Sequence, residues 1–369
     1  MNASPLKIAA LAAVPLGLFL TTSARAEIDV QQTNLVSDIP GMAKFTDPNL
    51  VNPWGISESG GSPFWVSNNG GNNATLYNTA GQPQSLVVSI PSGVPTGQVF
   101  NASTAFNNDK FIFAGEDGTI SGWRGALGST AEVLAGPASS STEFKGLAIA
   151  TVGTGTYLYA ADFGTGAIDV FPSTGAPALT GAFQDPSLPS GYAPFNIQNL
   201  NGNLYVTYAL VDSATGDDVA GLGNGFVDEF DLQGNLIRRV ASQGWLNSPW
   251  GLAIAPNSFG DIGGDLLVGN FGDGHINVFN PAGAFLEQLT WSNGDAVAVD
   301  GLWGLQFGNG GSGGASDRLY FTAGLDGEQH GLFGSFAAVP EPSTVYAGVA
   351  LVAACGFVTL RRRRQTKAA

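Results

Sequence analysis

Four polar residues end four copies of a repeated strand pattern, and their types could bind a hard cation. They are Asn68, Glu116, Asp162 and Asn270. Ca²⁺ takes about six to eight oxygen ligands from carboxylates, amides and carbonyls. Side chains that met around one axis could supply part of that shell, which makes Ca²⁺ the cofactor these residues favour. The structural alternative is stronger, because Asn and Asp before glycine commonly form turns.

The acid–base and nucleophilic groups are few. The two histidines, His275 and His330, precede the third strand of their repeats, where a polar surface loop is the ordinary setting. The sequence contains no His-Glu-x-x-His pair and no phosphate-binding loop. The Gly-rich stretch Asn69–Asn73 lacks the lysine and the helix that a phosphate loop needs. The residues alone therefore give catalysis only weak support.

A repeat of about 50 residues positions these groups. Its most regular part is an apolar-aromatic strand that ends in a small residue and then, in most copies, a polar one. The six copies are Phe64–Asn68, Ile112–Glu116, Leu158–Asp162, Leu204–Tyr208, Leu266–Asn270 and Leu319–Ala323. Successive ends are 48, 46, 46, 62 and 53 residues apart. A polar, Gly-rich turn and a further strand follow each copy.

A second repeated piece precedes each of these strands. The clear copies are Pro53–Ile56, Lys145–Ile149, Pro249–Ile254 and Leu302–Leu305, and the weaker ones are Pro194–Ile197 and Thr104–Phe106. Glycine within such a strand suits a close approach of two backbones, as where innermost strands crowd around an axis. Trp54, Trp250 and Trp303 in this piece could stack on sugar rings, but packing between neighbouring blades is favoured. Four short strands per unit, six times over, predict an all-β, six-bladed β-propeller, with seven blades as the alternative.

The pattern resembles the six-bladed propellers of the NHL and streptogramin-lyase-like groups. The shared unit is a "G-x-x-x … aromatic-V-x-D/N … I-x-V-F" pattern, and the likeness spans about residues 45–335. Because streptogramin-lyase-like propellers use channel histidines as general base, the resemblance makes His275 and His330 weak catalytic candidates. Six-bladed lactonases carry their metal at the channel mouth, which corresponds to the four polar strand ends.

An early segment is predicted to close the ring. The last repeat runs out of strands after Leu332–Phe336, and Ile28–Val36 belongs to no repeat of its own. An open ring would leave two exposed sheet edges. We therefore expect Ile28–Val36 to supply the outer strand of the last blade, the alternative being a disordered spacer.

Loop positions predict which groups share a face. In a four-stranded blade, the loops that lead into strand one and those between strands two and three open together. The four polar strand ends should then lie around one mouth, near the blade-start residues Asn52, Trp54, Lys145, Asn196, Trp250 and Trp303. The insertion from Asp212 to Asp218, continuing to Asn224 and Gly225, falls on this face and reads as a mobile lid more than as a Ca²⁺ site. Asn257–Asp265 and Gly308–Asp317 should be surface loops on the opposite face.

The N-terminus predicts export. Lys7 precedes the apolar run Ile8–Leu20, and Ala24-Arg25-Ala26 ends the segment. A basic start, a short apolar core and an A-x-A end are typical of a secretory signal peptide. The core is shorter than the roughly 20 residues that span a bilayer. Residues 1–26 are thus predicted to be removed after Ala26, with a retained anchor as the alternative.

The C-terminus reads as a sorting signal. Pro340, Glu341 and Pro342 lead into the apolar stretch 345–360, followed by Arg361, Arg362, Arg363 and Arg364. An apolar segment that stops at a basic cluster is typical of a span whose cationic end stays cytoplasmic. Residues 339–369 resemble the PEP-CTERM sorting signal of exported proteins of Gram-negative bacteria. The resemblance implies recognition by an exosortase-type transpeptidase and a final place at the cell surface or outside the cell, often beside exopolysaccharide. A plain membrane anchor is the alternative.

The charge balance narrows the partners of the predicted propeller, residues 27–338. The chain has a net charge of −15, and without its two ends 28 acids and seven bases remain, a net charge of −21. Such a surface repels nucleic acid and anionic membranes. Cys355 lies in the membrane segment, so this domain forms no disulfide. We expect an exported, non-enzymatic binding or matrix component of the envelope, with a Ca²⁺-dependent hydrolase or lyase at the channel mouth as the alternative.

Overall fold

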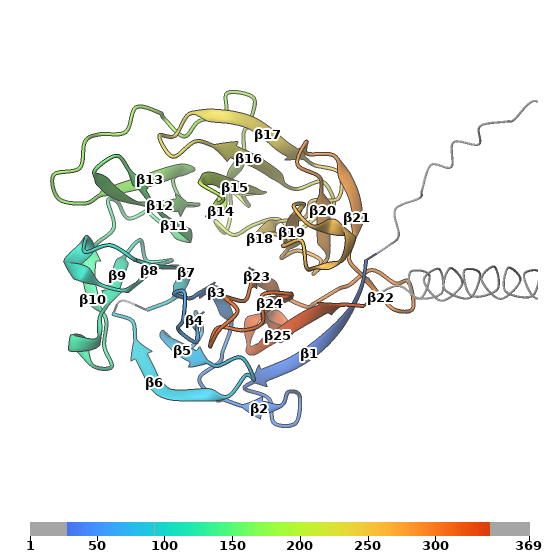
Figure 1. Cartoon of the computed structure of the whole chain (residues 1–369). Coiled ribbons are helices and arrows are strands. Elements are labelled where there is room, and N and C mark those ends of the chain that lie inside the picture. The colour runs from blue at the N-terminus through green and yellow to red at the C-terminus, as the bar shows by residue number, and fades with distance from the viewer. Residues whose placement is uncertain (1–27, 92, 340–369) are drawn as a thin grey trace, which may run out of the picture.

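A computed structural model describes residues 28–91 and 93–339, which form a ring of six β-sheets around a central axis (Figure 1). From the inner strand outward, the first three blades are β3 (Pro53–Ser57), β4 (Phe64–Asn68), β5 (Asn73–Tyr77) and β6 (Pro83–Ser89); β7 (Pro95–Phe100), β8 (Phe111–Gly115), β9 (Ile120–Trp123) and β10 (Glu132–Ala135); and β11 (Phe144–Val152), β12 (Gly155–Asp162) and β13 (Ala167–Pro172). The next two are β14 (Tyr192–Leu200), β15 (Asn203–Leu210), β16 (Phe226–Phe230) and β17 (Leu236–Ser242); and β18 (Pro249–Ile254), β19 (Leu266–Asn270), β20 (Ile276–Phe279) and β21 (Phe285–Gln288). The sixth blade is β23 (Leu302–Phe307), β24 (Arg318–Gly324), β25 (His330–Ala338) and β1 (Asp29–Ser37), with the short strands β2 (Phe45–Thr46) and β22 (Thr290–Trp291) beside β1. The six-bladed all-β prediction is confirmed.

The hydrophobic core is divided among the contacts between neighbouring blades. Second strands such as β4 are buried along their whole length, because successive side chains point to opposite faces of the sheet and each face meets another blade. Trp65 of β4 stacks on Phe111 of β8, with ring centroids 4.0 Å apart. On its other face, β4 packs Phe64 against Tyr320 of β24 at 4.4 Å. This burial on both faces explains why these strands are near-continuous apolar runs in the sequence.

Glycines let the inner strands approach one another around the axis, as predicted. A Cβ atom at Gly97 of β7 would lie 2.3 Å from the backbone nitrogen of Leu147 in β11. One at Gly55 of β3 would lie 2.5 Å from the carbonyl oxygen of Thr96. Neither position has room for a side chain, so the narrow inner ring depends on glycine.

Blade three departs from the prediction of four strands, because its sheet contains only β11, β12 and β13. The residues after β13 contain Pro177, Pro186 and Pro189, and proline cannot donate to a strand ladder. Instead, the segment reaches the next blade, where the amide of Phe183 donates to the carbonyl of Gly234 at 3.0 Å. The outer strand of this blade is thus replaced by a loop that joins blades three and four.

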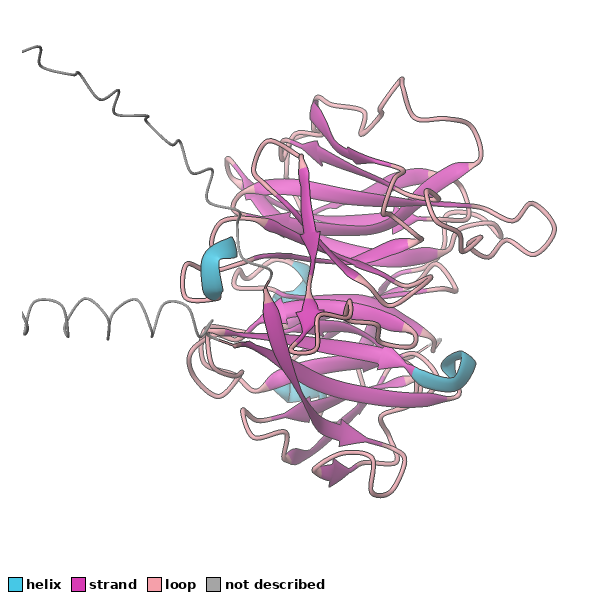
Figure 2. Ribbon diagram, turned by 90° about the vertical axis from the view of Figure 1, so that its right-hand side faces the viewer, coloured by secondary structure: helices cyan, strands magenta, loops and turns pink. Residues whose placement is uncertain are grey.

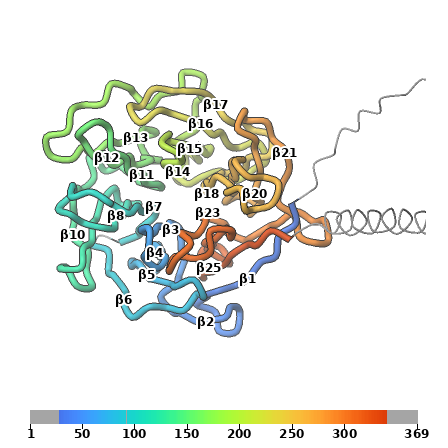
Figure 3. Tube along the Cα trace, viewed as in Figure 1, coloured from blue at the N-terminus to red at the C-terminus, as the bar shows by residue number. Residues whose placement is uncertain are grey.

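The predicted closure of the ring by the N-terminal segment is confirmed. β1 pairs antiparallel with β25 in a register that runs from Val30 opposite Ala338 to Ser37 opposite Leu332. The Cα trace shows β1 and β25 side by side although they come from opposite ends of the chain (Figure 3). Val36 is fully buried in this pairing. The last blade therefore takes its outer strand from the start of the fold.

Two further predictions from the sequence concern the start of blade two and the faces on which the insertions lie. Blade two begins at β7, not at Thr104–Phe106 as predicted; residues 106–108 form a short 3₁₀ helix, Phe106–Asn108. The Thr96-Gly97 start lacks the tryptophan that three of the clear copies have at positions 54, 250 and 303, and it was missed. The insertion Asp212–Asp218 lies between β15 and β16, whereas Asn257–Asp265 and Gly308–Asp317 join first to second strands at the opposite face.

Seen from the side, the ring is a thick disk whose strands run between two loop-bearing faces (Figure 2). The helices of the described residues are short: besides Phe106–Asn108, they are two 3₁₀ helices, Gly125–Leu127 and Gly260–Ile262, and α1, Leu325–Glu328. Within residues 28–91 and 93–339, no helix has the length and apolar character needed to cross a bilayer. The predicted signal peptide and the predicted sorting segment with Pro340, Glu341, Pro342 and its arginines fall outside these residues.

Candidate functional sites at the two ends of the channel

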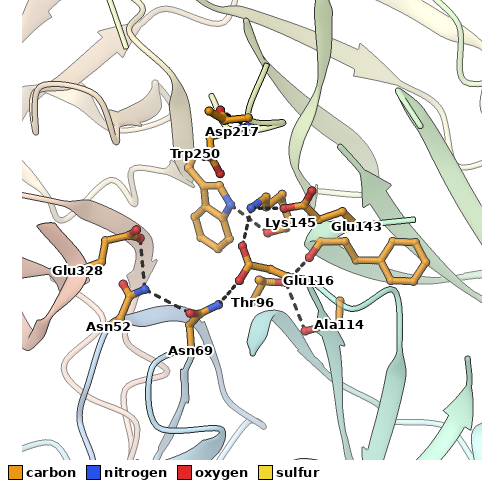
Figure 4. Close-up of polar contacts among 12 residues, drawn as sticks. Asn52, Asn69, Thr96, Ala114, Glu116, Glu143, Lys145, Asp217, Trp250 and Glu328 are labelled. Atoms are coloured by element: carbon orange, nitrogen blue, oxygen red, sulfur yellow. Dashed lines mark hydrogen bonds and ion pairs between the residues drawn. The ribbon is translucent and has the colours of Figure 1, made fainter. Parts of the chain in front are cut away.

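A buried lysine links two blades at one end of the axis (Figure 4). Lys145, at the start of β11, forms ion pairs with Glu116 of blade two and with Glu143, the latter at 2.5 Å. Its side chain is only 7% exposed, and its Nζ lies 5.4 Å from the ring centroid of Trp54. Burial opposes the charge of Lys145, but Glu116 and Glu143 outweigh it and hold the pKa of this lysine above its ordinary value. Lys145 is therefore a charged cross-link and not a nucleophile or base.

Hydrogen bonds extend this ion pair into a network across four blades. Asn69 Nδ2 donates to Glu116 at 2.8 Å and its Oδ1 accepts from Asn52 at 3.3 Å. Asn52 Nδ2 also donates to Glu328 at 3.2 Å, and Asn52 Oδ1 accepts from the indole of Trp303 at 3.2 Å. We call this end of the ring the network face, defined by Asn52, Asn69, Glu116, Glu143, Lys145 and Glu328. The contacts hold blades one, two, three and six in register.

Aromatic rings fill the axis beneath the network. Trp54 and Trp303 stack with centroids 3.5 Å apart, and Phe271 stacks on the other side of Trp303 at 3.9 Å. Trp250 meets Trp54 edge-on at 6.1 Å. Because the three tryptophans are at most 4% exposed, they pack the blades together, as favoured from the sequence. They are not available as a platform for a sugar ring.

The blade-four insertion supplies a further acid to this end. Burial raises the pKa of Asp218, against the hydroxyl of Ser248 and the charge of Lys145, which lower it. Burial likewise raises the pKa of Glu328, against its hydrogen bond from Asn52. Because the charge of Lys145 acts on the carboxyl of Asp218, the end of the insertion lies on the same side of the ring as the network. The network face thus holds more carboxyl groups than cations.

Of the four polar strand ends, only Glu116 joins the network. Asn68 donates to Asn73 at 2.8 Å within its own hairpin. Asp162 accepts from the amides of Glu143 and Thr165. Asn270 donates to Asp273 at 3.0 Å and to the carbonyl of Trp245 at 2.9 Å.

Three of the four candidates therefore stabilise separate turns and do not meet at one point. Among the residues that the structure describes, no group of three or more His, Cys, Asp or Glu side chains could hold a metal ion. Of the blade-start residues, Asn52, Lys145 and the tryptophans gather at the axis. Asn196 donates to the carbonyl of Trp250 at 2.7 Å. It occupies the inner-strand position at which the other blades have glycine.

The Nδ1 atom of each histidine lies within hydrogen-bond distance of an oxygen atom of the protein. His275 Nδ1 lies 2.6 Å from the carbonyl of Val297. His330 Nδ1 lies 2.7 Å from Asp38, which follows the closing strand. The hydrogen bond to Asp38 raises the pKa of His330. Neither histidine lines the channel cavity described next.

The opposite end of the axis contains a cavity of about 380 Å³, within the range of small-ligand sites. Trp250 lines the cavity on the side of the stacked aromatic rings, and the ends of the inner strands form its wall. We call it the channel cavity; its polar lining residues are Ser57, Glu58, Gln98, Asn196, Gln198, Asn199 and Gln306. The concave space of this propeller therefore lies away from the predicted mouth.

Three residues that line the cavity each have a buried side-chain oxygen without a hydrogen-bond partner: Ser57 Oγ, Glu58 Oε2 and Gln98 Oε1. Gln98 is 6% exposed, and its Nε2 donates to the carbonyls of Gly55 at 2.7 Å and Trp65 at 2.6 Å. Its Oε1 is buried and accepts no hydrogen bond, and the same holds for Glu58 Oε2. Burial raises the pKa of Glu58 to about 8, against a hydrogen bond from Gln306 that lowers it. At neutral pH the cavity wall is thus polar but uncharged.

Sequence reasoning missed these residues, although a signal was present. Glu58, Gln98, Gln198 and Gln306 fall within or just after inner strands that are otherwise apolar, at positions where blades three and five have residues such as Ala148. A polar side chain in the innermost strand of a propeller can only face the axis or a neighbouring blade. Aligning the six inner strands on their glycines would have marked these positions.

The fold defines the class of protein, a six-bladed β-propeller. The chain is similar to the solved structure of a streptogramin B lyase, with a TM-score of 0.50 and 11% identity over 86% of this chain and 100% of that one. It is also similar to a structural genomics protein of unknown function from Bacteroides thetaiotaomicron, with a TM-score of 0.52 and 11% identity over 85% of this chain and 77% of that one. At this identity the likeness concerns the fold alone.

Sequence similarity identifies the family. The chain is 33% identical over 328 residues to the uncharacterized protein R648 of Acanthamoeba polyphaga mimivirus, covering 82% of this chain and 78% of the relative. It is 31% identical over 328 residues to protein L690 of the same virus, covering 82% and 84%. The chain belongs to the family of these viral proteins. No protein-family profile matches it.

Proposed function

We propose that the protein is an exported binding propeller that holds its ligand in the channel cavity. The observation that carries this proposal is the cavity itself, a space of about 380 Å³ whose wall is lined by polar side chains of the inner strands. The half-buried Gln198, Asn199 and Gln306 belong to this wall. Their amide groups can donate hydrogen bonds to a ligand and accept them from it.

The chemistry of the two ends favours binding over catalysis. The cavity contains one ionisable side chain, Glu58, and its lining residues include no second acid or base with which Glu58 could form an acid–base pair. The network face contains a lysine that two carboxylates hold in its charged form. The Ca²⁺-dependent hydrolase or lyase at the mouth would need Asp162 and Asn270 to turn toward the axis, and both are engaged in their own turns.

Export and sorting form part of the same proposal. Residues 1–26 have the pattern of a signal peptide, and 339–369 have that of a PEP-CTERM signal. The proposed partners are the secretion machinery, an exosortase-type transpeptidase and, at the cell surface, exopolysaccharide. The net charge of −21 calculated for residues 27–338 argues against nucleic acid as a partner.

Blocking the channel should remove a ligand that the protein acquires in its own cell. Gln198 is half-buried in the cavity wall, so Gln198→Trp fills the space with an aromatic ring. The matched control is Gln329→Trp, at an exposed position on the side of the network face. Native mass spectrometry of protein recovered from the producing cells should show a bound mass in wild type and in the control, and none in Gln198→Trp.

The result that contradicts the proposal is equally direct. A wild-type protein without any bound mass, or an adduct that survives in Gln198→Trp, would remove the channel as the binding site. Circular dichroism of both variants shows whether the propeller is retained, so a loss of ligand through unfolding is recognised.

A further inference from the structure

We propose that the channel cavity binds an uncharged, hydroxyl-rich ligand end, such as a terminal sugar unit, and discriminates against charged ones. This inference rests on the proposed function, and it adds the chemical class of the ligand. It follows from the hydrogen-bonding groups that the cavity presents and from the absence of any fixed charge among the residues that line it.

The amide groups of the cavity are arranged to complement hydroxyls. The two N–H groups of Gln98 are both used on backbone carbonyls, and its oxygen is fully buried, so this side chain shapes the wall and is not itself a ligand contact. The half-buried amides of Gln198 and Gln306 add donors and acceptors on two other blades. Hydroxyl groups both donate and accept, and they satisfy such a wall without bringing a charge out of water.

The cavity wall offers a charged ligand no side chain of opposite charge at neutral pH. The lining residues include no Lys, Arg or His, and Glu58 is their only acid. Burying an ion without a partner is costly. An anion would find no cation there, and a cation would require Glu58 to lose its proton in a buried setting. Neutral ligands are therefore preferred at pH 7.

The surroundings of Glu58 keep its carboxyl protonated. It lies next to Gly313 of the β23–β24 loop, where an added Cβ would overlap Glu58 Oε2. Tyr320 of β24 is close enough for the charges of Glu58, Asp317 and Arg318 to act on it. The hydrogen-bonding neighbour of Glu58 is Gln306. Burial is the leading cause of the raised pKa, about 8. A ligand that displaced water from the cavity would bury Glu58 further, so its ionisation should weaken binding.

Calorimetric titration of the full-length protein with cellobiose and maltose, and with the anionic disaccharide cellobiouronic acid, tests this inference. We expect a neutral disaccharide to bind at pH 7, and the uronic acid to bind at least about tenfold more weakly. Raising the pH to 9.5 should weaken neutral binding by about tenfold in wild type. Glu58→Gln keeps a neutral hydrogen-bonding group and should bind equally well at both pH values. Asp169→Asn, at a half-buried carboxyl on the outer side of blade three, should follow the wild-type profile.

Stability provides a check that is independent of ligand. The unfolded chain releases the Glu58 proton near pH 4.5, and the folded protein keeps it until about 8. The contribution of Glu58 to the free energy of unfolding therefore falls as pH rises across this window. Glu58→Gln removes that loss, so its melting temperature should exceed that of wild type at pH 9 but not at pH 4. If Glu58→Gln and the wild type had the same melting temperature at pH 9 as well as at pH 4, the protonated state assigned to Glu58 would be contradicted.

The outcomes separate this inference from the proposed function. Preferential binding of the uronic acid, or no binding of either neutral disaccharide at millimolar concentration, overturns the ligand class. A bound mass that disappears in Gln198→Trp would still support the channel as the site. Equal loss of neutral binding at pH 9.5 in wild type and Glu58→Gln removes Glu58 from the account.

Discussion

Val36→Asp is expected to destabilise the whole ring by more than about 4 kcal/mol, a loss typical of a buried unpaired charge. Val36 is fully buried, opposite Phe333 in the pairing of the first and last strands of the fold. The substitution places a carboxylate in the core between blades six and one and also loosens the strand that closes the ring. Open sheet edges would then be exposed. Urea unfolding followed by tryptophan fluorescence measures the loss.

The control lies in the same strand. Gln31 faces solvent and pairs with Ala337, so Gln31→Asp adds the same charge to β1 without burying it. Its stability should remain within about 0.5 kcal/mol of wild type. If Val36→Asp unfolds at the same urea concentration as the wild type, β1 does not close the ring. The same conclusion follows if Val36→Asp and Gln31→Asp lose the same amount of free energy of unfolding.

Gly97→Ala is expected to cost about 3 kcal/mol or more, although it adds a single methyl group. The new Cβ would lie 2.3 Å from the backbone nitrogen of Leu147, and no flexible side chain can move to relieve the contact. Blades two and three would have to separate at the axis, which would also disturb the ion pair between Glu116 and Lys145. Thermal unfolding by calorimetry measures this effect.

Gly125→Ala is the matched comparison for this methyl group. A Cβ at Gly125, at the start of a short 3₁₀ helix, has nothing within 4 Å. Alanine also reduces the conformational freedom of the unfolded chain, so this variant should be neutral or slightly more stable. Similar melting temperatures for Gly97→Ala and Gly125→Ala would show that the inner strands are not packed as closely as described.

The architecture could be predicted because its signals are local and repeated. The six second strands are buried on both faces, so each appears as an apolar run that ends at a turn. Ile28–Val36 was recognisable as the closing strand because it has strand character and no partner in its own part of the chain. The missing strand of blade three was less evident. Pro177, Pro186 and Pro189 marked it, but the regularity of the other repeats hid the exception.

The site could not be predicted to the same degree, because its groups meet across blades. Asn68, Asp162 and Asn270 looked like a converging set, yet the backbone amides and carbonyls of their own turns are closer partners than the axis. Glu143 joins Lys145 although nothing in its position singles it out. The unpaired oxygen of Gln98 depends on two carbonyls of the preceding blade. This unpaired acceptor can be recognised only when the strands β3, β4 and β7 are placed together.

The most direct test of the channel as binding site is the protection of a single thiol. Ile149 lines the channel cavity and is half-buried, and Cys355 is the only cysteine of the chain. In the full chain with Cys355→Ser, Ile149→Cys places one thiol in the cavity, and Gln329→Cys places one at the side of the network face. The measurement is the rate of modification by a small maleimide, with and without cellobiose at ten times its dissociation constant.

The account predicts that cellobiose slows modification of Ile149→Cys by about tenfold, because about one site in ten remains free, and that the rate at Gln329→Cys does not change. Protection at position 329 with none at position 149 would contradict it.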